Sequence, residues 1–567
     1  MIRPRLVSFV STSLAASALL VSLALASSPL AAQEDRVVVH GAEVIGDPVT
    51  PHIFYGDVRD LPTAPQWQYG DEYIVNPRRW FGEDTSFFTP ATPDPLLERQ
   101  AQAAVRGVSS TTLFAFQGLD FGASPPDPTL DVGSGHVIQI VNASNFIIYD
   151  KATGATLAGP TALDSLGTGA CASGRGDPVV IYDALADRWV MSEFSSGLAM
   201  CVYVSMTNDP VTGGWCSYLF GTSTDYPKYA VWPDAYYVTT NEGNVPPVYA
   251  FDRENMLTCG TARPIQKLVA PGLPGLGFEA FTPGDLDGPT LPPAGSPAYF
   301  MRHRDTELGN QGPMNPTQDI LELWQMQVDW TTPANTTLTQ LPDILVSEFD
   351  SNLCPPIGVF SCIPQPGTTT RLDPLLEVIM NRLSYRNFGS HQMLLGVLQT
   401  DIGDFEDHSG ERWFELRKTG AGPWSLFQEG TFSPDADHRF MGTVAMDGDG
   451  NILLGYALSS TTTNPSIAFT GRHAADPAGT MTEPEQVLIA GVGNSATSRY
   501  GDYSQMGIDP VDDCTFWFTV EYAEGVSNTT TGIGAVKFDG CTGLAASLIF
   551  SDGFESGNTS AWSNVIP

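Results

Sequence analysis

The stretch DPTLDVGSGHVIQIVN (Asp127–Asn142) decides the fold, because its pattern recurs along the chain. An apolar run leads into a turn built on Asp, and a second apolar run follows. Such a strand–turn–strand module, repeated over hundreds of residues, predicts radial or solenoidal repetition of small sheets. The other copies are DPVVIYDALADRWVMSEF (Asp177–Phe194), DYPKYAVWPDAYYVTTNE (Asp225–Glu242), HRFMGTVAMDGDGNILLGYALS (His438–Ser459) and YGDYSQMGIDPVDDCTFWFTVEY (Tyr500–Tyr522).

Further strand patterns follow these modules, so the repeating unit is a sheet of four antiparallel strands. CVYVSMT (from Cys201) and WCSYLFG (from Trp215) follow the second module, for example. Such sheets closed in a ring form a β-propeller, which leaves no long exposed edge. The sequence therefore predicts an all-β chain with a seven-bladed β-propeller, or six or eight blades if an irregular middle unit is misread. The predicted units start near Asp127, Asp177, Asp225, Glu279, Arg371, His438 and Arg499.

An apolar strand pattern, TTLFAFQG from Thr111, precedes the first unit and has no unit of its own. The last unit supplies IGAVKFDG from Ile533 but no fourth strand. We therefore expect the earlier strand to complete the last blade and close the ring. Residues 33–110 carry aromatic residues without a repeat and predict an extended arm, in which Pro95–Arg106 has a helical pattern.

The chain begins like a secretory signal peptide. MIRPR is basic, an apolar stretch rich in Ser and Ala follows, and small residues lead to Ala31-Ala32. We expect a signal peptide at 1–32, secretion from a bacterium, and no membrane span in the mature protein. The mature protein is expected to be a monomer. The propeller then covers 111–545 and a tail covers 546–567.

The eight cysteines predict disulfides, because the chain is expected in an oxidising compartment and has no C-x-x-C pair. Cys354 and Cys362 are expected to close a small loop. Cys514 and Cys541 are expected to form a disulfide within the last unit. The other two predicted pairs are Cys171–Cys201 and Cys216–Cys259.

Charge and missing motifs exclude several function classes. The formal net charge of −36 repels phosphate backbones, which argues against nucleic acid as a partner. The sequence has no G-x-S-x-G elbow, no H-E-x-x-H and no phosphate loop. It is therefore neither a serine hydrolase of the elbow type nor an H-E-x-x-H zinc protease.

The repeats resemble a family of secreted bacterial β-propeller proteins of unassigned function. The resemblance covers about Ser124 to Cys541 and rests on the modules above with DLDGPTLPPAGSPAYF and YRNFGSHQ. It implies a propeller broadly like the sialidase superfamily and implies no activity. The tail SDGFESGNTSAW resembles short terminal motifs of secreted proteobacterial proteins, which implies a sorting or processing role.

Ionisable residues gather at the starts of the predicted innermost strands, where propellers usually bind ligands. Carboxylates near Arg, His and Tyr can perform acid–base chemistry on sugars, but ion pairs between blades would use the same residues. The candidate catalytic residues are Asp177, Asp225, His438, Asp502 and Tyr503. The candidate substrate-binding residues are Lys228, Arg386, His391, Arg439 and Arg499.

Two kinds of enzyme, a sialidase and a polysaccharide lyase, would use residues of these types. Arg386, Arg439 and Arg499 resemble the arginine cluster with which sialidases hold a carboxylate, although the S-x-D-x-G-x-T-W turns of sialidases are missing. A polysaccharide lyase would use Tyr503 or Tyr385 as base, His438 or His391 as acid and Arg439 as carboxylate clamp.

The turn DGDGN offers alternating oxygen ligands at Asp447, Asp449 and Asn451, as calcium loops do. A tight turn would use the same residues. Ca²⁺ is therefore the candidate cofactor.

Two functions remain open. The first is a secreted propeller that binds, and in the enzymatic version cleaves, an extracellular anionic polysaccharide at the channel rim, as a glycoside hydrolase or polysaccharide lyase. The alternative is a non-enzymatic adhesion or scaffold propeller for a surface ligand. The first requires an exposed positive patch made by Lys228, His438, Arg439 and Arg499.

Overall fold

The protein is described by a computed structural model, which shows an all-β chain, as predicted. Within the described residues the α-helices are two short ones, α1 (Leu97–Gln102) and α2 (Arg253–Met256), and α1 lies in the segment with the helical pattern. No described helix is long and apolar enough to cross a membrane. The predicted signal peptide and tail lie outside the described residues, which are 36–65, 74–75, 94–120, 122–195, 199–222, 225–243, 245–273, 280–308, 314–354, 360–403 and 407–543.

The first three repeated modules each open an antiparallel sheet with the strands expected from the sequence. Their order in each sheet follows the chain, because each strand pairs with the next one through a hairpin. The strands are β7 (Thr129–Val132), β8 (His136–Val141), β9 (Asn145–Asp150) and β10 (Thr156–Ala162); β11 (Gly174–Asp183), β12 (Arg188–Ser195), β13 (Met200–Ser205) and β14 (Trp215–Phe220); and β15 (Lys228–Val231), β16 (Tyr236–Thr239), β17 (Pro247–Phe251) and β18 (Ile265–Val269).

The next two groups of strands share one sheet, because β19 and β24 pair in parallel. The predicted start near Arg371 is wrong: the strand that opens this group begins at Leu383, and the irregular segment before it carries no repeat signal. The strands are β19 (Thr282–Asp287), β20 (Ala298–Arg304), β21 (Gln318–Gln327), β22 (Thr337–Gln340) and β23 (Ile344–Ser347), then β24 (Leu383–Asn387), β25 (Gln392–Asp401), β26 (Ser409–Lys418) and β27 (Ser425–Phe432).

The last sheet is completed by a strand from the beginning of the chain. β5 (Ser110–Gln117) pairs antiparallel with β34, with Ala115 opposite Gly534, so the expected closure by this strand is confirmed. The strands of the last two sheets are β28 (His438–Met446), β29 (Ile452–Ser459), β30 (Ser466–Arg472) and β31 (Gln486–Ile489), then β32 (Gln505–Ile508), β33 (Thr515–Gly525) and β34 (Asn528–Phe538).

Strands upstream of β5 join the outer edges of three sheets. β1 (Val38–His40) pairs with β22, β2 (Glu43–Ile45) with β18, and β3 (His52–Phe54) with β14. Each covers an edge that would otherwise expose unpaired backbone groups. The remaining short elements are β4 (Ile74–Val75), β6 (Ala123–Ser124), η1 (Val58–Asp60), η2 (Leu163–Leu166), η3 (Gly169–Ala172) and η4 (Pro333–Asn335).

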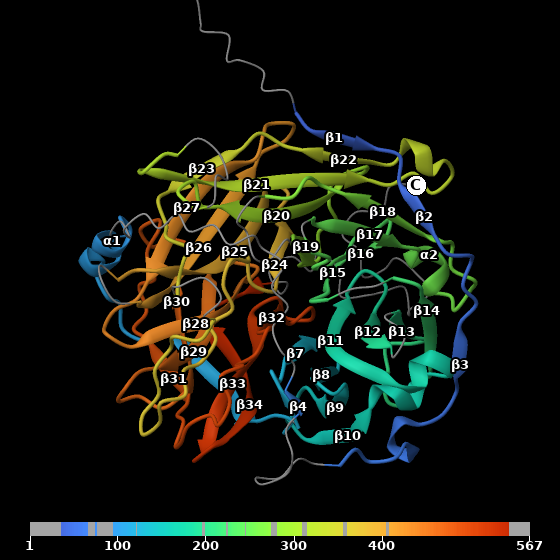
Figure 1. Cartoon of the computed structure of the whole chain (residues 1–567), viewed down its shortest axis with the longest axis horizontal. Helices are drawn as coiled ribbons and strands as arrows, with labels where there is room; N and C mark the ends of the chain where they lie inside the picture. Colours follow the sequence, from blue (N-terminus) through green and yellow to red (C-terminus); the bar gives the residue numbers. More distant parts are fainter. Residues whose placement is uncertain are drawn as a thin grey trace, which may run out of the picture. The chain divides into compact units, whose positions relative to one another are not determined.

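The first strands of the sheets contact one another in a closed cycle. The order is β7, β11, β15, β19, β24, β28, β32 and back to β7. In Figure 1 these strands lie toward the centre of the ring of sheets, and β1, β2 and β3 run along its periphery. Sheets that each place one strand at a common centre have the arrangement of a β-propeller.

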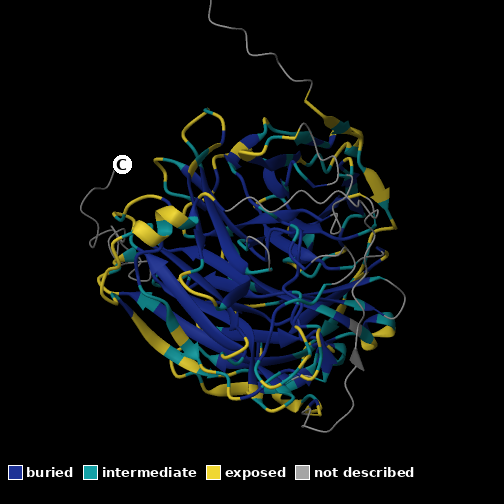
Figure 2. Cartoon of the chain, turned by 60° about the vertical axis from the view of Figure 1, so that its left-hand side comes forward, coloured by how far each residue is buried: buried dark blue, intermediate teal, exposed yellow. Residues whose placement is uncertain are grey.

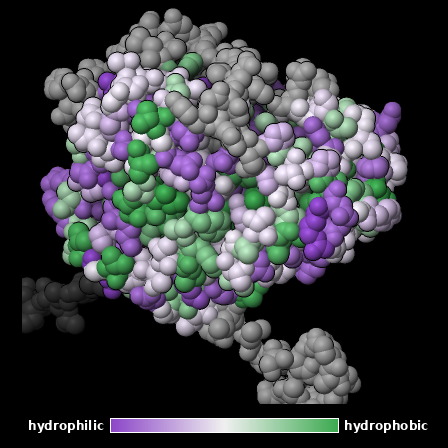
Figure 3. Space-filling view, turned by 90° about the horizontal axis from the view of Figure 1, so that it is seen from below, coloured by the Kyte–Doolittle hydropathy of each residue, from purple (hydrophilic) through white to green (hydrophobic). Residues whose placement is uncertain are grey.

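The core lies between the sheets. Buried residues fill the strands and exposed residues mark the turns, as Figure 2 shows. On the face seen in Figure 3, apolar side chains form separate groups between polar ones.

Burial of a large side chain contributes roughly 1.5–3 kcal/mol to the stability of the fold. The largest buried side chains include Trp189, Trp215, Trp232, Trp324, Trp413 and Trp517.

All four predicted disulfides are confirmed. Cys171–Cys201 joins η3 to β13, and Cys216–Cys259 joins β14 of the second sheet to the segment between α2 and β18 of the third unit. Cys354–Cys362 closes a small loop, and Cys514–Cys541 joins the two ends of the β33–β34 hairpin. Disulfides of this kind form and persist outside the reducing cytosol, and they fit an extracellular protein.

Candidate functional site

Several of the predicted residues meet at the starts of the first strands, and we call this group the entry cluster. Hydrogen bonds and charge interactions link its members across β7, β11, β15 and β32, although they lie far apart in the sequence. The predicted convergence of strand starts is therefore present. The entry cluster consists of Asp127, Asp177, Asp225, Asp373, Arg499 and Asp502.

Asp127 is buried at the centre of the entry cluster. Its Oδ2 accepts a hydrogen bond from Asn142 Nδ2 at 2.7 Å, and its Oδ1 accepts one from the backbone N–H of Asp502 at 2.9 Å. Asp127 and Asp177 share an unusual left-handed backbone, with φ of 45° and 47°. Such strain persists only where neighbouring contacts hold it, and here the carboxylate contacts do so.

Arg499 joins the cluster to the segment before β24. Its Nη1 donates to Asp373 Oδ2 at 2.8 Å and its Nη2 to Asp502 Oδ2 at 2.5 Å. Burial lowers the pKa of Arg499, but the charges of Asp502 and Asp373 outweigh burial and raise it. The guanidinium is thus committed to carboxylates of the protein itself.

Two buried carboxyl groups of the entry cluster, those of Asp127 and Asp177, disfavour ionisation. Burial, reinforced by the charges of Asp502 and Asp177, raises the pKa of Asp127 well above its usual range. Burial and the charges of Asp225 and Asp502 raise the pKa of Asp177 to about 7. Near neutral pH these side chains therefore hold protons that an isolated Asp would have lost.

Lys228 and Tyr503 lie beneath the entry cluster and away from solvent. Lys228 is 0 % exposed, and its Nζ donates to Thr282 Oγ1 at 2.8 Å and to the Ile379 carbonyl at 2.6 Å. Burial lowers its pKa well below the usual range. Burial and the charge of Asp177 raise the pKa of Tyr503 well above its usual range. These environments argue against Lys228 as a substrate contact and against Tyr503 as a general base.

His438 and Arg439 have buried structural environments. Arg439 is 0 % exposed and donates to Glu485 at 2.8 and 3.1 Å, which ties β28 to the segment before β31. His438 Nδ1 accepts from the backbone N–H of Ser409 at 3.2 Å, and burial with the nearby His408 lowers its pKa to about 4. The predicted positive patch of Lys228, His438, Arg439 and Arg499 is wrong, because these side chains are buried or paired.

The two predicted residues of the fifth group lie apart from the entry cluster. Arg386 is buried and forms a bidentate pair with Asp513, at 2.7 and 2.8 Å. His391 lies in the hairpin after β24, where it stacks on Phe388 and borders a shallow hollow with Arg417. Tyr385, the other proposed base, donates to Gln392, and burial raises its pKa.

The DGDGN turn uses its oxygens within the protein. Asp447 Oδ1 accepts from the backbone N–H groups of Asp449 and Asn451 at 3.0 and 2.8 Å. Asp449 accepts from Thr542, and Asn451 Oδ1 accepts from Ala474. These contacts are those of the tight-turn alternative, and a calcium ion at this turn stays a prediction.

A hollow of about 390 Å³ lies at the other ends of the first strands, and we call it the exit pocket. It is bordered by the end of β7, β11, β19 and β32 and by the residue before β24. Three aspartates and one arginine line it: Asp131, Asp285, Asp287 and Arg382.

Arg382 holds the acidic side chains of the exit pocket in place. Its Nη1 donates to Asp285 Oδ2 at 3.0 Å, its Nη2 to Asp287 Oδ1 at 2.5 Å, and its Nε to the Met506 carbonyl at 2.9 Å. Asp131 accepts from the backbone N–H of Tyr182 at 2.7 Å. The pocket is therefore fixed by contacts between neighbouring sheets.

The exit pocket also contains an acceptor that the protein leaves unused. Asp287 is 8 % exposed, and its Oδ2 has no hydrogen-bond partner. Burial raises the pKa of Asp131 to about 7 and that of Asp285 to about 6, and the positive charge of Arg382 limits both shifts. A buried acceptor without a donor is unfavourable, so a ligand that donates a hydrogen bond there would bind favourably.

The sequence contains a signal for this pocket. Asp131 and Asp287 lie near the ends of first strands, where the repeated modules carry an Asp. The sequence pattern alone predicts only a turn at these positions. Arg382 precedes β24 in a segment without a repeat, so its partners could not be inferred.

Comparisons with known proteins do not assign a family. No protein-family model and no curated protein matches the chain. Among solved structures, an α-L-arabinanase of Penicillium chrysogenum complexed with arabinobiose is 10% identical with a TM-score of 0.29, covering 56% of this chain and 94% of its own. A fungal alcohol oxidase in complex with copper is 11% identical with a TM-score of 0.40, covering 76% and 77%. A lectin in complex with α-methyl fucoside is 11% identical with a TM-score of 0.32, covering 64% and 97%. Likenesses at this level carry no argument about function.

Proposed function

We propose that this chain is a secreted seven-bladed β-propeller that binds an extracellular carbohydrate in the exit pocket. The cycle of first strands supports the blade count, and the four disulfides support the extracellular location. In this proposal 1–32 is the signal peptide, 33–110 the N-terminal arm, 111–545 the propeller and 546–567 the tail.

The unused acceptor of Asp287 carries the proposal. Carbohydrate hydroxyl groups are donors, and a buried carboxylate oxygen beside a guanidinium can bind them in a defined geometry. The hollow has the volume of a small-ligand site and combines these polar groups with apolar lining from Leu185 and Leu291.

The lining favours uncharged sugars over the anionic polysaccharide expected from the sequence. Arg382 is the cationic side chain of the lining, and it is already paired with Asp285 and Asp287. Together with Asp131, these aspartates outnumber the one arginine of the lining. The pocket would therefore repel the negative charge of a uronate or a sulfate. A neutral glycan meets no such penalty.

Hydrolysis of the bound glycan is a second candidate function. Asp131 and Asp285 have pKa values of about 7 and about 6, so near neutral pH one can be protonated while the other is ionised. Glycoside hydrolysis uses two carboxyl groups in these two states. Release of reducing ends from the glycans that bind would test this activity.

Asp287→Asn tests the binding site. The amide keeps the size of the side chain and can still accept from Arg382, but it replaces the free acceptor with a donor. We expect neutral oligosaccharides to bind the wild type and to lose at least about tenfold in affinity, or about 1.4 kcal/mol, in the variant. Calorimetric titration against neutral, uronate and sulfated glycans measures this.

Asp225→Asn, in the entry cluster, is the matched control and should bind like the wild type. Preferential binding of uronates or sulfated glycans, or unchanged affinity in Asp287→Asn, would contradict the proposal. If none of these glycans bound, the scaffold alternative would take its place.

A further inference from the structure

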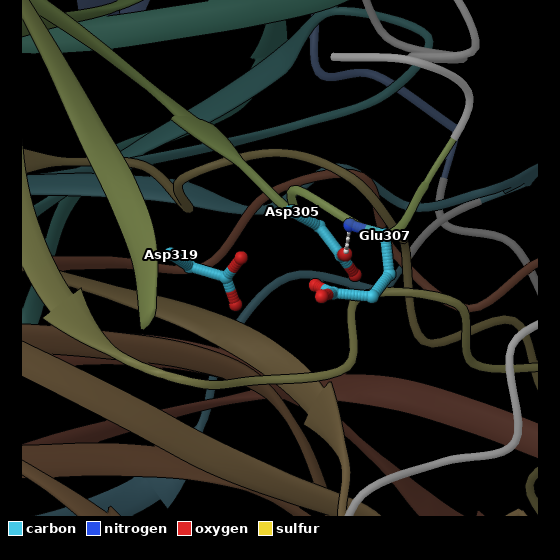
Figure 4. Close-up of side chains that lie close together, drawn as sticks. All are labelled: Asp305, Glu307 and Asp319. Carbon is cyan, nitrogen blue, oxygen red and sulfur yellow. Dashed lines mark hydrogen bonds between the residues drawn. The ribbon is translucent and has the colours of Figure 1, made fainter. Parts of the chain in front are cut away.

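A third group of acidic side chains lies outside the entry cluster and the exit pocket. One carboxylate oxygen from each of Asp305, Glu307 and Asp319 lies within 4.8 Å of the others. Asp305 follows β20, Glu307 lies in the turn after it, and Asp319 lies in β21. Figure 4 shows the three carboxylates around a common space.

Glu348, which follows β23, adds a fourth carboxyl to this group. It is 5 % exposed, and its Oε2 is buried without a hydrogen-bond partner. Its charge interactions with Glu307 and Asp305 and its contact with Asp319 show that it faces the group. Glu307 Oε1 is likewise buried without a partner. Two buried oxygens without a partner in one acidic group would be satisfied by a positively charged ligand.

Backbone N–H groups hold two of the carboxylates in position. Asp319 accepts from Thr306 and Phe349, each at 2.8 Å, through different oxygens. Asp305 Oδ2 accepts from the backbone N–H of Ser351 at 2.9 Å. A carboxylate oxygen has two lone pairs, so each Asp319 oxygen keeps acceptor capacity for a further ligand. Asp305 accepts two hydrogen bonds at each oxygen, from Ser351 at Oδ2 and from the backbone of Glu307 and Leu308 at Oδ1, so its carboxylate contributes mainly negative charge.

Arg412, the cationic side chain that acts on Glu348, is paired with other carboxylates. Arg412 donates to the carbonyl oxygen of Glu348, and its charge is paired with Asp94 and Glu429. Like charges gathered away from solvent repel one another, so a cation bound among these carboxylates would stabilise the group.

We propose that Asp305, Glu307, Asp319 and Glu348 form a calcium site. Ca²⁺ binds carboxylate oxygens at about 2.3–2.6 Å, so two ligands on opposite sides of the ion lie about 4.6–5.2 Å apart. The 4.8 Å grouping fits this span. Ca²⁺ also accepts irregular coordination, whereas Mg²⁺ requires near-octahedral geometry and retains water. The site is independent of the carbohydrate proposal.

Glu348→Gln separates a calcium site from a purely structural carboxyl group. The new amide can donate to Asp319, and one negative charge is removed, so the chelator-treated variant should unfold at the same temperature as the chelator-treated wild type or higher. Calcium should raise the unfolding temperature of the wild type and leave that of Glu348→Gln unchanged. Calorimetry should find one Ca²⁺ per wild-type chain at this site and at least about tenfold weaker binding in the variant.

Glu307→Gln should weaken calcium binding in the same way. It is the variant to test if Glu348→Gln does not fold. Glu254→Gln is the control, because the Glu254 side chain is 79% exposed elsewhere, and it should bind calcium like the wild type. Absence of calcium binding by the chelator-treated wild type would overturn the proposal. Full calcium binding by both glutamine variants at this group would overturn it as well.

Discussion

The entry cluster and the exit pocket lie at opposite ends of the same first strands, yet they use similar side chains in different ways. At the entry, Arg499 bridges Asp373 and Asp502. Asp127 accepts hydrogen bonds from Asn142 and from the backbone N–H of Asp502. These charges hold neighbouring sheets together.

At the exit, Arg382 also bridges two carboxylates, but a hollow remains beside them and Asp287 keeps an unused oxygen. The comparison teaches that a concentration of ionisable groups does not by itself mark a ligand site. What distinguishes the exit is a buried polar atom left without a partner, in a side chain that lines a hollow.

The largest expected effect is on stability at the entry cluster. Arg499→Met leaves Asp373 and Asp502 without the guanidinium that pairs them. We expect the free energy of unfolding to fall by about 3–5 kcal/mol, as measured by urea denaturation. Arg59→Met removes an exposed ion pair with Asp57, which solvent screens, so its effect should be far smaller. Equal effects in the two variants would contradict a structural role for the entry cluster.

The pH dependence of stability gives an intermediate effect. Because burial raises the pKa of Asp177 to about 7 in the folded state, the folded protein binds this proton more tightly than the unfolded chain. The contribution is fully present below the unfolded pKa and is lost as pH rises toward 7.

Asp177→Asn should therefore reduce the decline of stability between about pH 4 and 7, by at most about 1.4 kcal/mol per pH unit. Urea denaturation at several pH values measures the slope. Asp449→Asn, in an exposed turn, should retain the wild-type slope. An unchanged slope in Asp177→Asn would show that this carboxyl ionises normally in the folded protein.

The smallest effect is expected at His391. Its ring stacks on Phe388 in a surface hairpin and borders a hollow separate from the exit pocket. His391→Ala should change the free energy of unfolding by no more than about 0.5 kcal/mol and leave glycan affinity unchanged. A loss of glycan binding in this variant would move the site away from Asp287.

The repeated modules made the fold predictable. Alternating apolar strands and Asp turns predicted the first strands β7, β11, β15, β28 and the sheets that follow them, and the unpaired pattern from Thr111 predicted the closing strand. The disulfides follow the order of the cysteines along the chain, because each cysteine pairs with the next one, even where Cys216–Cys259 links the second unit to the third.

The sites were less predictable. The convergence of Asp127, Asp177 and Asp502 follows from equivalent positions in the repeat, but burial and pairing depend on packing between sheets. Arg382 and Glu348 lie in segments without a repeat pattern, so only the folded chain shows which carboxylates they meet.

Because β5 pairs with β34 near the end of the chain, the exit pocket depends on the last sheet being formed. Thr111 in β5 donates to Asp539, which lies 428 residues later. Contacts between such distant segments form late, because a long loop must close before they contribute. The pocket borders both β7 and β32, so it is assembled only when the last sheet joins the first. A chain interrupted before β34 would still form individual sheets, but it would have no place to hold the ligand.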